Sequence, residues 1–91
     1  MIDVVKRGGK RPTESYERAK LERSLRAALH SLKTPEGQAG DVATAVCDIV
    51  EQWLDRRNEV TSEDLRRKAS EALTPLHPEA AFIYKNYNVI L

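Results

Sequence analysis

Apolar residues recur at helical spacing through most of this chain after residue 16, and this periodicity constrains the fold more than any other feature. A spacing of three and four residues places side chains on one face of an α-helix, where they are buried together. The first such run predicts a helix over residues 17–32. Its apolar positions are Leu21, Leu25, Ala28, Leu29 and Leu32.

The second run is the clearest of the four, and it predicts a helix over residues 38–57. Gly37 and Gly40 weaken the turn that follows Pro35, so the helix is expected to start near residue 38. Cys47 falls on this helix, where a small buried side chain is its expected role. The predicted apolar face consists of Val42, Ala45, Val46, Ile49, Val50, Trp53 and Leu54.

Two shorter helices complete the chain. Residues 62–74 are predicted to form the third helix, because Thr61 or Ser62 can cap its start and acidic residues fill its first turn. Pro75 interrupts this helix, and Pro78 suits the first turn of a fourth helix over residues 78–90. Aromatic residues at helical spacing, Tyr84 and Tyr87, lie on that last helix.

The first 16 residues favour strands instead of a helix. β-Branched residues precede residue 6, and Gly8-Gly9 supplies the two positive-φ positions that a tight hairpin turn requires. Pro12 lacks an N–H group and belongs on a sheet edge. We therefore predict a β-hairpin over residues 2–16. The expected fold is α+β but mainly α: one domain over residues 1–91, with an N-terminal hairpin cap on a four-helix bundle.

The charges of the chain nearly cancel overall, yet they are unevenly distributed. Residues 1–26 carry eight basic and four acidic side chains, a net charge of +4, whereas residues 36–64 carry eight acidic and two basic ones, a net charge of −6. A general polyanion binder would be basic throughout. One basic end beside an acidic middle fits a small localised anion, or a partner that docks on one face.

The residue types of enzymes, metal sites and membrane spans are poorly represented. Cys47 is the one cysteine, which allows neither an internal disulfide nor a multi-cysteine zinc site. His30 and His77 are explained by positions near helix ends, and no pattern fixes them near a nucleophile. Apolar stretches are too short for a membrane span, and no secretory signal is visible. We expect a cytoplasmic protein that is not an enzyme and has no metal site.

The predicted hairpin tip has the composition of a phosphate-binding loop. Lys6, Arg7, Lys10 and Arg11 flank the two glycines, so charged donors and turn amides could reinforce one another. It is not a P-loop, because the GxxxxGK[ST] pattern is missing. A solvated hairpin whose charges prevent edge-to-edge aggregation explains the composition equally well.

The order of several short motifs resembles the ATP-cone. This nucleotide-binding regulatory domain is found at the N-terminus of many ribonucleotide reductases and in the bacterial repressor of their genes. The matching segments are Val4-Val5-Lys6-Arg7-Gly8-Gly9, Glu14-Ser15-Tyr16-Glu17-Arg18-Ala19-Lys20-Leu21 and Thr61-Ser62-Glu63-Asp64-Leu65. The resemblance covers nearly the whole chain. It implies a small β-sheet cap over four helices, with ATP or dATP bound between cap and helices and reported through changed subunit association.

The resemblance also assigns roles to residues. Lys6, Arg7 and Lys20 match the phosphate-binding positions, and Glu14 matches an acid that accepts a hydrogen bond from the ribose or base. Adenine nucleotide is the implied effector, Mg²⁺ is a further candidate ligand, and a ribonucleotide reductase or related regulator is the implied partner. The full set of implied nucleotide-binding residues is Val4, Lys6, Arg7, Glu14, Lys20, Leu21, Ser62, Leu65, Arg66 and Tyr87.

This chain departs from the family pattern in several places. Gly8 replaces the usual Asp or Asn of the turn, and two additional residues separate Lys6 from Lys20. No zinc ribbon precedes the domain and no reductase barrel follows it, so a fragment or a free-standing domain acting in trans is expected. Two other interpretations stay open: a nucleic-acid-binding protein that uses the basic hairpin, which the acidic second helix disfavours, and a dimerisation module with apolar helix faces.

Overall fold

Four helices make up most of the structure, which is a computed structural model that describes residues 3–5, 14–57 and 59–86. The fold is mainly helical, as predicted. The helices are α1 (Arg18–Ser31), α2 (Glu36–Leu54), α3 (Ser62–Leu73) and α4 (Pro78–Asn86). Three short strands accompany them: β1 (Asp3–Val5), β2 (Glu14–Ser15) and β3 (Glu59–Thr61).

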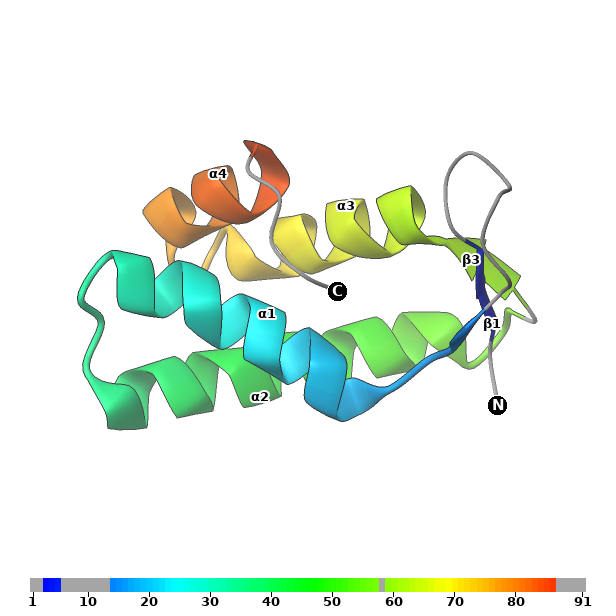
Figure 1. Ribbon diagram of the computed structural model, residues 1–91, viewed down its shortest axis with the longest axis horizontal. Coiled ribbons are helices and arrows are strands. Elements are labelled where there is room, and N and C mark those ends of the chain that lie inside the picture. The colour runs from blue at the N-terminus through cyan, green and yellow to red at the C-terminus, as the bar shows by residue number, and fades with distance from the viewer. Residues whose placement is uncertain (1–2, 6–13, 58, 87–91) are drawn as a thin grey trace.

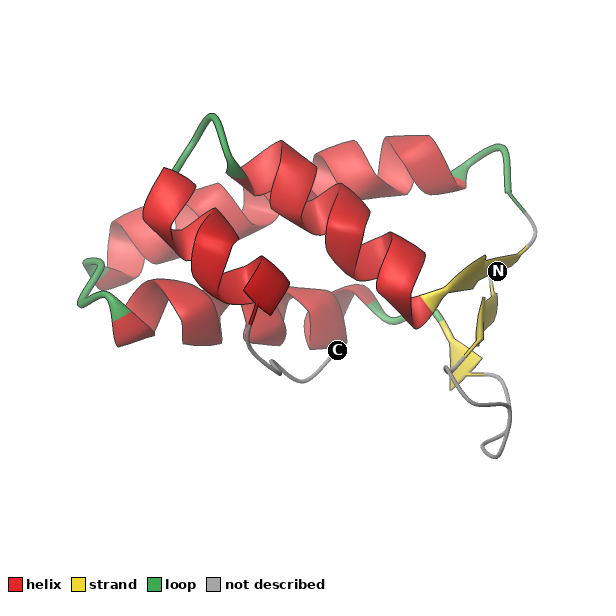
Figure 2. Ribbon diagram, turned by 90° about the horizontal axis from the view of Figure 1, so that it is seen from above, coloured by secondary structure: helices red, strands yellow, loops and turns green. Residues whose placement is uncertain are grey.

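The four helices pack as a bundle in which each helix contacts the next one in the sequence, and the strands lie at one end (Figure 1). α1 contacts α2 and α4, and α3 also contacts α2 and α4. The connection between α1 and α2 lies at the end opposite the strands, as both views show (Figures 1 and 2). The bundle therefore has a sheet end, formed by β1 and β3 and the start of α3, and a far end without strands.

The sheet joins the N-terminal segment of the chain to the segment that connects α2 with α3. Its strand order is β2-β1-β3. β1 runs antiparallel to β2, pairing Val4 with Glu14, and parallel to β3, pairing Val4 with Val60. The turn of the predicted hairpin falls in residues 6–13, outside the described residues, so the hairpin as a whole stays a prediction. β3 was not predicted, because three residues with one buried valine give no local signal for a parallel partner far away in sequence.

α1 ends one residue before the predicted boundary, and the chain then turns through a residue with positive φ. Lys33 has a φ of 59°. The amide of Lys33 donates to the carbonyl of His30 (2.9 Å), and the amide of Thr34 donates to that of Leu29 (3.1 Å). These two bonds form a Schellman motif, in which the residue at the Lys33 position is usually glycine. A lysine in this conformation costs stability.

The boundaries of α2 differ from the prediction at both ends. The helix begins at Glu36, because the carbonyl of Pro35 already accepts the amide of Ala39 at 2.8 Å. Gly40 lies against α1: a Cβ there would be 3.4 Å from the Arg26 guanidinium. The helix ends at Leu54 rather than at residue 57. α3 ends at residue 73 instead of 74, and the described part of α4 ends at residue 86 instead of 90.

The buried face of α2 is also shifted from the predicted one. Val42, Ala45 and Trp53 are half-buried, and Ile49 is 40% exposed. Alanines, Ala39 and Ala43, take inner positions instead, on the helix that contacts both α1 and α3. The buried residues of α2 are Ala39, Ala43, Val46, Cys47, Val50 and Leu54.

A buried hydroxyl pair links α4 to α1 inside this core. Ser24 donates its proton to the carbonyl of Leu21 at 2.8 Å. The hydroxyl of Tyr84, a fully buried residue, lies 2.9 Å from the Ser24 oxygen and therefore donates to it. Burial raises the pKa of Tyr84 well above its ordinary value. Both hydroxyls are satisfied, so the pair fixes where α4 crosses α1 without the penalty of an unpaired polar group.

Replacing Lys33 by glycine should stabilise the protein. Glycine removes the steric cost of the positive φ, so we expect Lys33→Gly to raise the free energy of unfolding by roughly 0.5–1 kcal/mol. The matched control is Arg23→Gly, in the exposed middle of α1, which should lower it by about 1 kcal/mol. Urea unfolding measures both changes. A destabilised Lys33→Gly variant would show that the positive φ is not a source of strain.

Candidate functional site

Seven of the ten residues predicted to bind nucleotide are described by the structure, and they belong to β1, β2 and the first turns of α1 and α3. β1 ends at Val5, which pairs with Thr61, the residue that caps α3. The basic segment of the sequence follows Val5 directly. A strand end and a helix N-terminus therefore meet at the point where that segment begins.

Three of the predicted residues are core residues at this end. Val4, Leu21 and Leu65 are only 6%, 2% and 4% exposed, and they belong to the apolar cluster that forms the core of the whole bundle. Val4 and Val60 are neighbours in the sheet and both are buried, so β1 and β3 turn these side chains toward the helices. These residues support the sheet end of the bundle, while their own side chains are covered.

The start of α3 carries two further predicted residues. Thr61 accepts the amide of Asp64 through its side-chain oxygen at 2.9 Å, which fixes the first turn. Ser62 is half-exposed beside it. Arg66, one turn further, is half-buried with its Nε atom covered, and its charge lowers the pKa of Tyr84. Arg66 is therefore partly covered by the bundle, and its charge acts on the hydroxyl of Tyr84 in α4.

The remaining predicted residues are described in part or not at all. Lys20 lies in the first turn of α1 and is half-buried. Glu14 pairs with Val4 through the sheet backbone. Lys6, Arg7 and Tyr87 lie outside the described residues, and so do Lys10 and Arg11. Their assigned roles stay predictions.

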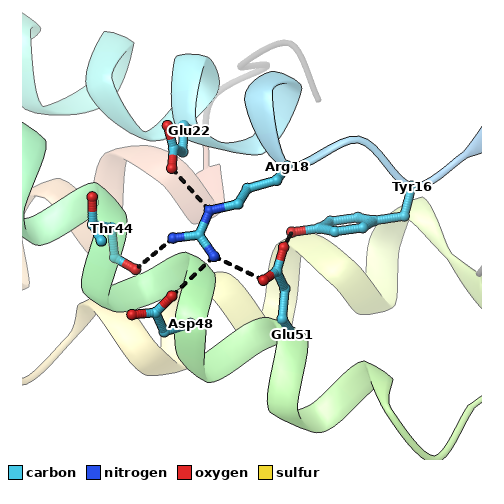
Figure 3. A network of polar contacts seen from close by, with 6 residues as sticks. All are labelled: Tyr16, Arg18, Glu22, Thr44, Asp48 and Glu51. Atoms are coloured by element: carbon cyan, nitrogen blue, oxygen red, sulfur yellow. Dashed lines mark hydrogen bonds and ion pairs between the residues drawn. The ribbon is translucent and has the colours of Figure 1, made fainter. Parts of the chain in front are cut away.

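Sequence analysis missed a polar cluster around Arg18 at the α1–α2 interface (Figure 3). Its guanidinium contacts three carboxylates: Glu22 at 3.0 Å, Glu51 at 2.7 Å and Asp48 at 2.9 Å. It also donates to the carbonyl of Thr44 at 3.4 Å. The spacing of Arg18 and Glu22 on one helix, and of Asp48 and Glu51 on another, is the signal that could have indicated this cluster.

Tyr16 connects the cluster to the strand that precedes α1. Its hydroxyl donates to the second carboxylate oxygen of Glu51 at 3.0 Å (Figure 3). Burial and the negative charge of Glu51 raise the pKa of Tyr16, so the phenol stays protonated and remains a donor. Together Tyr16 and Arg18 fix the β2–α1 junction on α2, and Arg18 is engaged within the protein.

The described residues offer no strong candidate for a nucleophile or a metal site. Burial raises the pKa of Cys47 to about 12, which keeps its thiol protonated. His77 accepts the amide of Ala80 at 3.3 Å and so acts at the start of α4. No group of three His, Cys, Asp or Glu residues within 3–5, 14–57 and 59–86 could hold a metal ion. None of the helices in those ranges is long and apolar enough to cross a membrane.

Burial of the Cys47 thiol should make stability fall at alkaline pH. Its pKa is raised from 9.0 to about 12 in the folded protein, so its contribution is fully present below pH 9 and is lost as the pH rises toward 12. Cys47→Ala removes this contribution. The free energy of unfolding of the variant should therefore fall less steeply above pH 9 than that of the unmodified protein, and the two slopes should differ by up to about 1.4 kcal/mol per pH unit. Urea unfolding at several pH values measures the slopes.

The matched control for this measurement is Val46→Ala, a neighbouring buried position without a titratable group. Its destabilisation should be equal at every pH, whereas that of Cys47→Ala should shrink as the pH rises. Equal slopes above pH 9 in Cys47→Ala and the unmodified protein would contradict the burial of the thiol.

Comparison with known protein families, with curated proteins and with solved structures found no match to this chain. The functional conclusion therefore depends on the residues and geometry described above and on the motif resemblance.

Proposed function

We propose that this protein is a regulatory module that binds adenine nucleotide, ATP or dATP, at the sheet end of the bundle. The observation that carries the proposal is the parallel pairing of β1 with β3, which sets the end of β1 beside Thr61 at the start of α3. In the chain, the next residues after β1 are Lys6 and Arg7. In sequence, the basic segment therefore begins at a strand end that adjoins a helix N-terminus, where amides favour an anion.

The distribution of charge supports the same location. α2 is the acidic element, and two of its carboxylates, Asp48 and Glu51, are paired with Arg18. Pairing reduces the repulsion that these acids would exert on a phosphate near α1. Because Tyr16 and Arg18 hold the junction between β2 and α1, they also set the position of Lys20, two residues further along α1.

On this proposal the binding site has three parts. β1 and β2 are the arms of a hairpin that covers the bundle, with Lys6 and Arg7 on the phosphates together with Lys20. Glu14 accepts a hydrogen bond from the ribose or base. The base lies toward Ser62, Arg66 and Tyr87, above the buried side chains of Val4, Leu21 and Leu65. Mg²⁺ would accompany the phosphates.

A regulatory role requires that the nucleotides differ in their effect. ATP and dATP differ by one ribose hydroxyl, and a ligand shifts an equilibrium only by its difference in affinity for the two states. The implied partner, a ribonucleotide reductase or a related regulator, would therefore respond to contacts near the ribose. Glu14 and Lys20 are the candidates for these contacts.

Thermal unfolding with ATP or dATP tests the proposal. At a nucleotide concentration of about 100 times Kd, binding to the folded state adds about 2.7 kcal/mol, which raises the Tm of a domain of this size by about 10–20 °C. Lys6→Gln should remove most of this shift and leave the ligand-free Tm unchanged. The matched control is Lys33→Gln, the same change in the α1–α2 connection, which lies at the far end of the bundle (Figure 1); this variant should retain the full shift.

Two results would contradict the proposal. One is an unchanged Tm at saturating ATP and at saturating dATP. The other is an equal loss of the shift in Lys6→Gln and Lys33→Gln, which would indicate nonspecific attraction to positive charge. A salt-sensitive shift with duplex DNA, absent with nucleotide, would favour the nucleic-acid-binding interpretation instead.

A further inference from the structure

The outer face of α4 carries an exposed aromatic side chain at its centre. Phe82 is 63% exposed. The other exposed residues of the helix surround it, while Tyr84 and two alanines on the opposite side are buried. We call this surface the Phe82 face; it consists of Pro78, Glu79, Phe82, Lys85 and Asn86. One exposed phenylalanine is common in monomers, so exposure by itself does not indicate a partner.

Hollows adjoin Phe82 on both sides. The first, of about 320 Å³, lies between α3 and α4 and is bordered by Ser70, Thr74 and Phe82. The second, of about 370 Å³, lies toward the end of α1 and is bordered by Leu32, Phe82 and Ile83. A protruding ring next to hollows large enough for a ring is the shape that a two-fold symmetric contact needs, because each copy supplies both parts.

The charged residues of the Phe82 face are also arranged to suit a two-fold symmetric contact. Glu79 lies three residues before Phe82 and Lys85 lies three residues after it, and both are exposed. Within the described residues, neither forms an ion pair in its own chain. If two copies of α4 pack antiparallel about Phe82, each Glu79 lies at the level of the other copy's Lys85. The antiparallel helix dipoles also attract.

We propose that the Phe82 face is a homodimer interface, in which two α4 helices pack antiparallel with Phe82 at the centre and Glu79 opposite Lys85 of the second copy. The inference does not depend on nucleotide binding, since it concerns a different surface. The nine described residues of α4 span about 13.5 Å, so the contact that they make is smaller than a standard interface. Association is therefore weak, in the micromolar range or above.

Sedimentation equilibrium of the 91-residue chain, from about 10 μM to about 1 mM, tests the proposal. We expect a monomer–dimer equilibrium in the unmodified protein. Glu79→Lys places two lysines at each level of the contact, and Lys85→Glu places two glutamates there, so each variant alone should dimerise about tenfold more weakly. An equimolar mixture of the two variants should regain dimerisation, because every opposed pair is again a lysine and a glutamate.

Three controls complete the design. Asp41→Lys, an equal charge reversal at an exposed position of α2, should leave the equilibrium unchanged. Phe82→Ala should weaken dimerisation at both low and high salt, whereas the effect of each charge reversal should decrease at high salt. Circular dichroism at about 10 μM shows whether each variant is folded, and all these positions are exposed.

Two outcomes would overturn the proposal. The first is an unmodified protein that stays monomeric up to about 1 mM. The second is a dimer whose interface lies elsewhere on the molecule. It would be recognised by dimerisation that persists unchanged in Glu79→Lys and Phe82→Ala, or by a mixture of the two charge variants that associates no better than either alone.

Discussion

The pairing of β1 with β3 is the contact on which the rest of this structure depends. It joins the first strand of the chain to the residue that begins α3, and it buries Val4 and Val60 side by side against the helices. A parallel pair cannot be closed by a short turn. Here α1 and α2 form the connection, so the sheet end of the bundle exists only when those helices are packed.

A cluster of charged and polar residues around Arg18 holds the start of α1 against α2. Arg18 is surrounded by carboxylates of α1 and α2, and Tyr16 adds a neutral donor to Glu51 (Figure 3). These groups hold the β2–α1 junction and are satisfied within the protein. The basic residues that follow Val5 in the sequence lie outside the described residues, and the proposed nucleotide site assigns a function to them.

Helical periodicity was sufficient to predict the four helices and their order, because each helix buries residues spaced by three or four. Helical periodicity was not sufficient to predict which face of α2 is buried. Apolar residues occupy more than half of its circumference, so packing against α1 and α3 decided that Ala43 lies inside and Ile49 outside. β3 escaped prediction because its partner is distant in sequence. The Arg18 cluster did so because three carboxylates from two helices converge only after folding. Sequence motifs supplied every candidate of the proposed site. The structure describes where seven of them lie: Val4, Glu14, Lys20, Leu21, Ser62, Leu65 and Arg66.

The central claim is that adenine nucleotide binds at the sheet end. Amide chemical shifts during a titration with dATP test it most directly, because they locate the ligand residue by residue. The account predicts that the largest changes occur in β1, in β3 and in the first turns of α1 and α3, with little change in the α1–α2 connection at the far end (Figure 1). Changes concentrated at the far end, or no changes at saturating dATP, would contradict it.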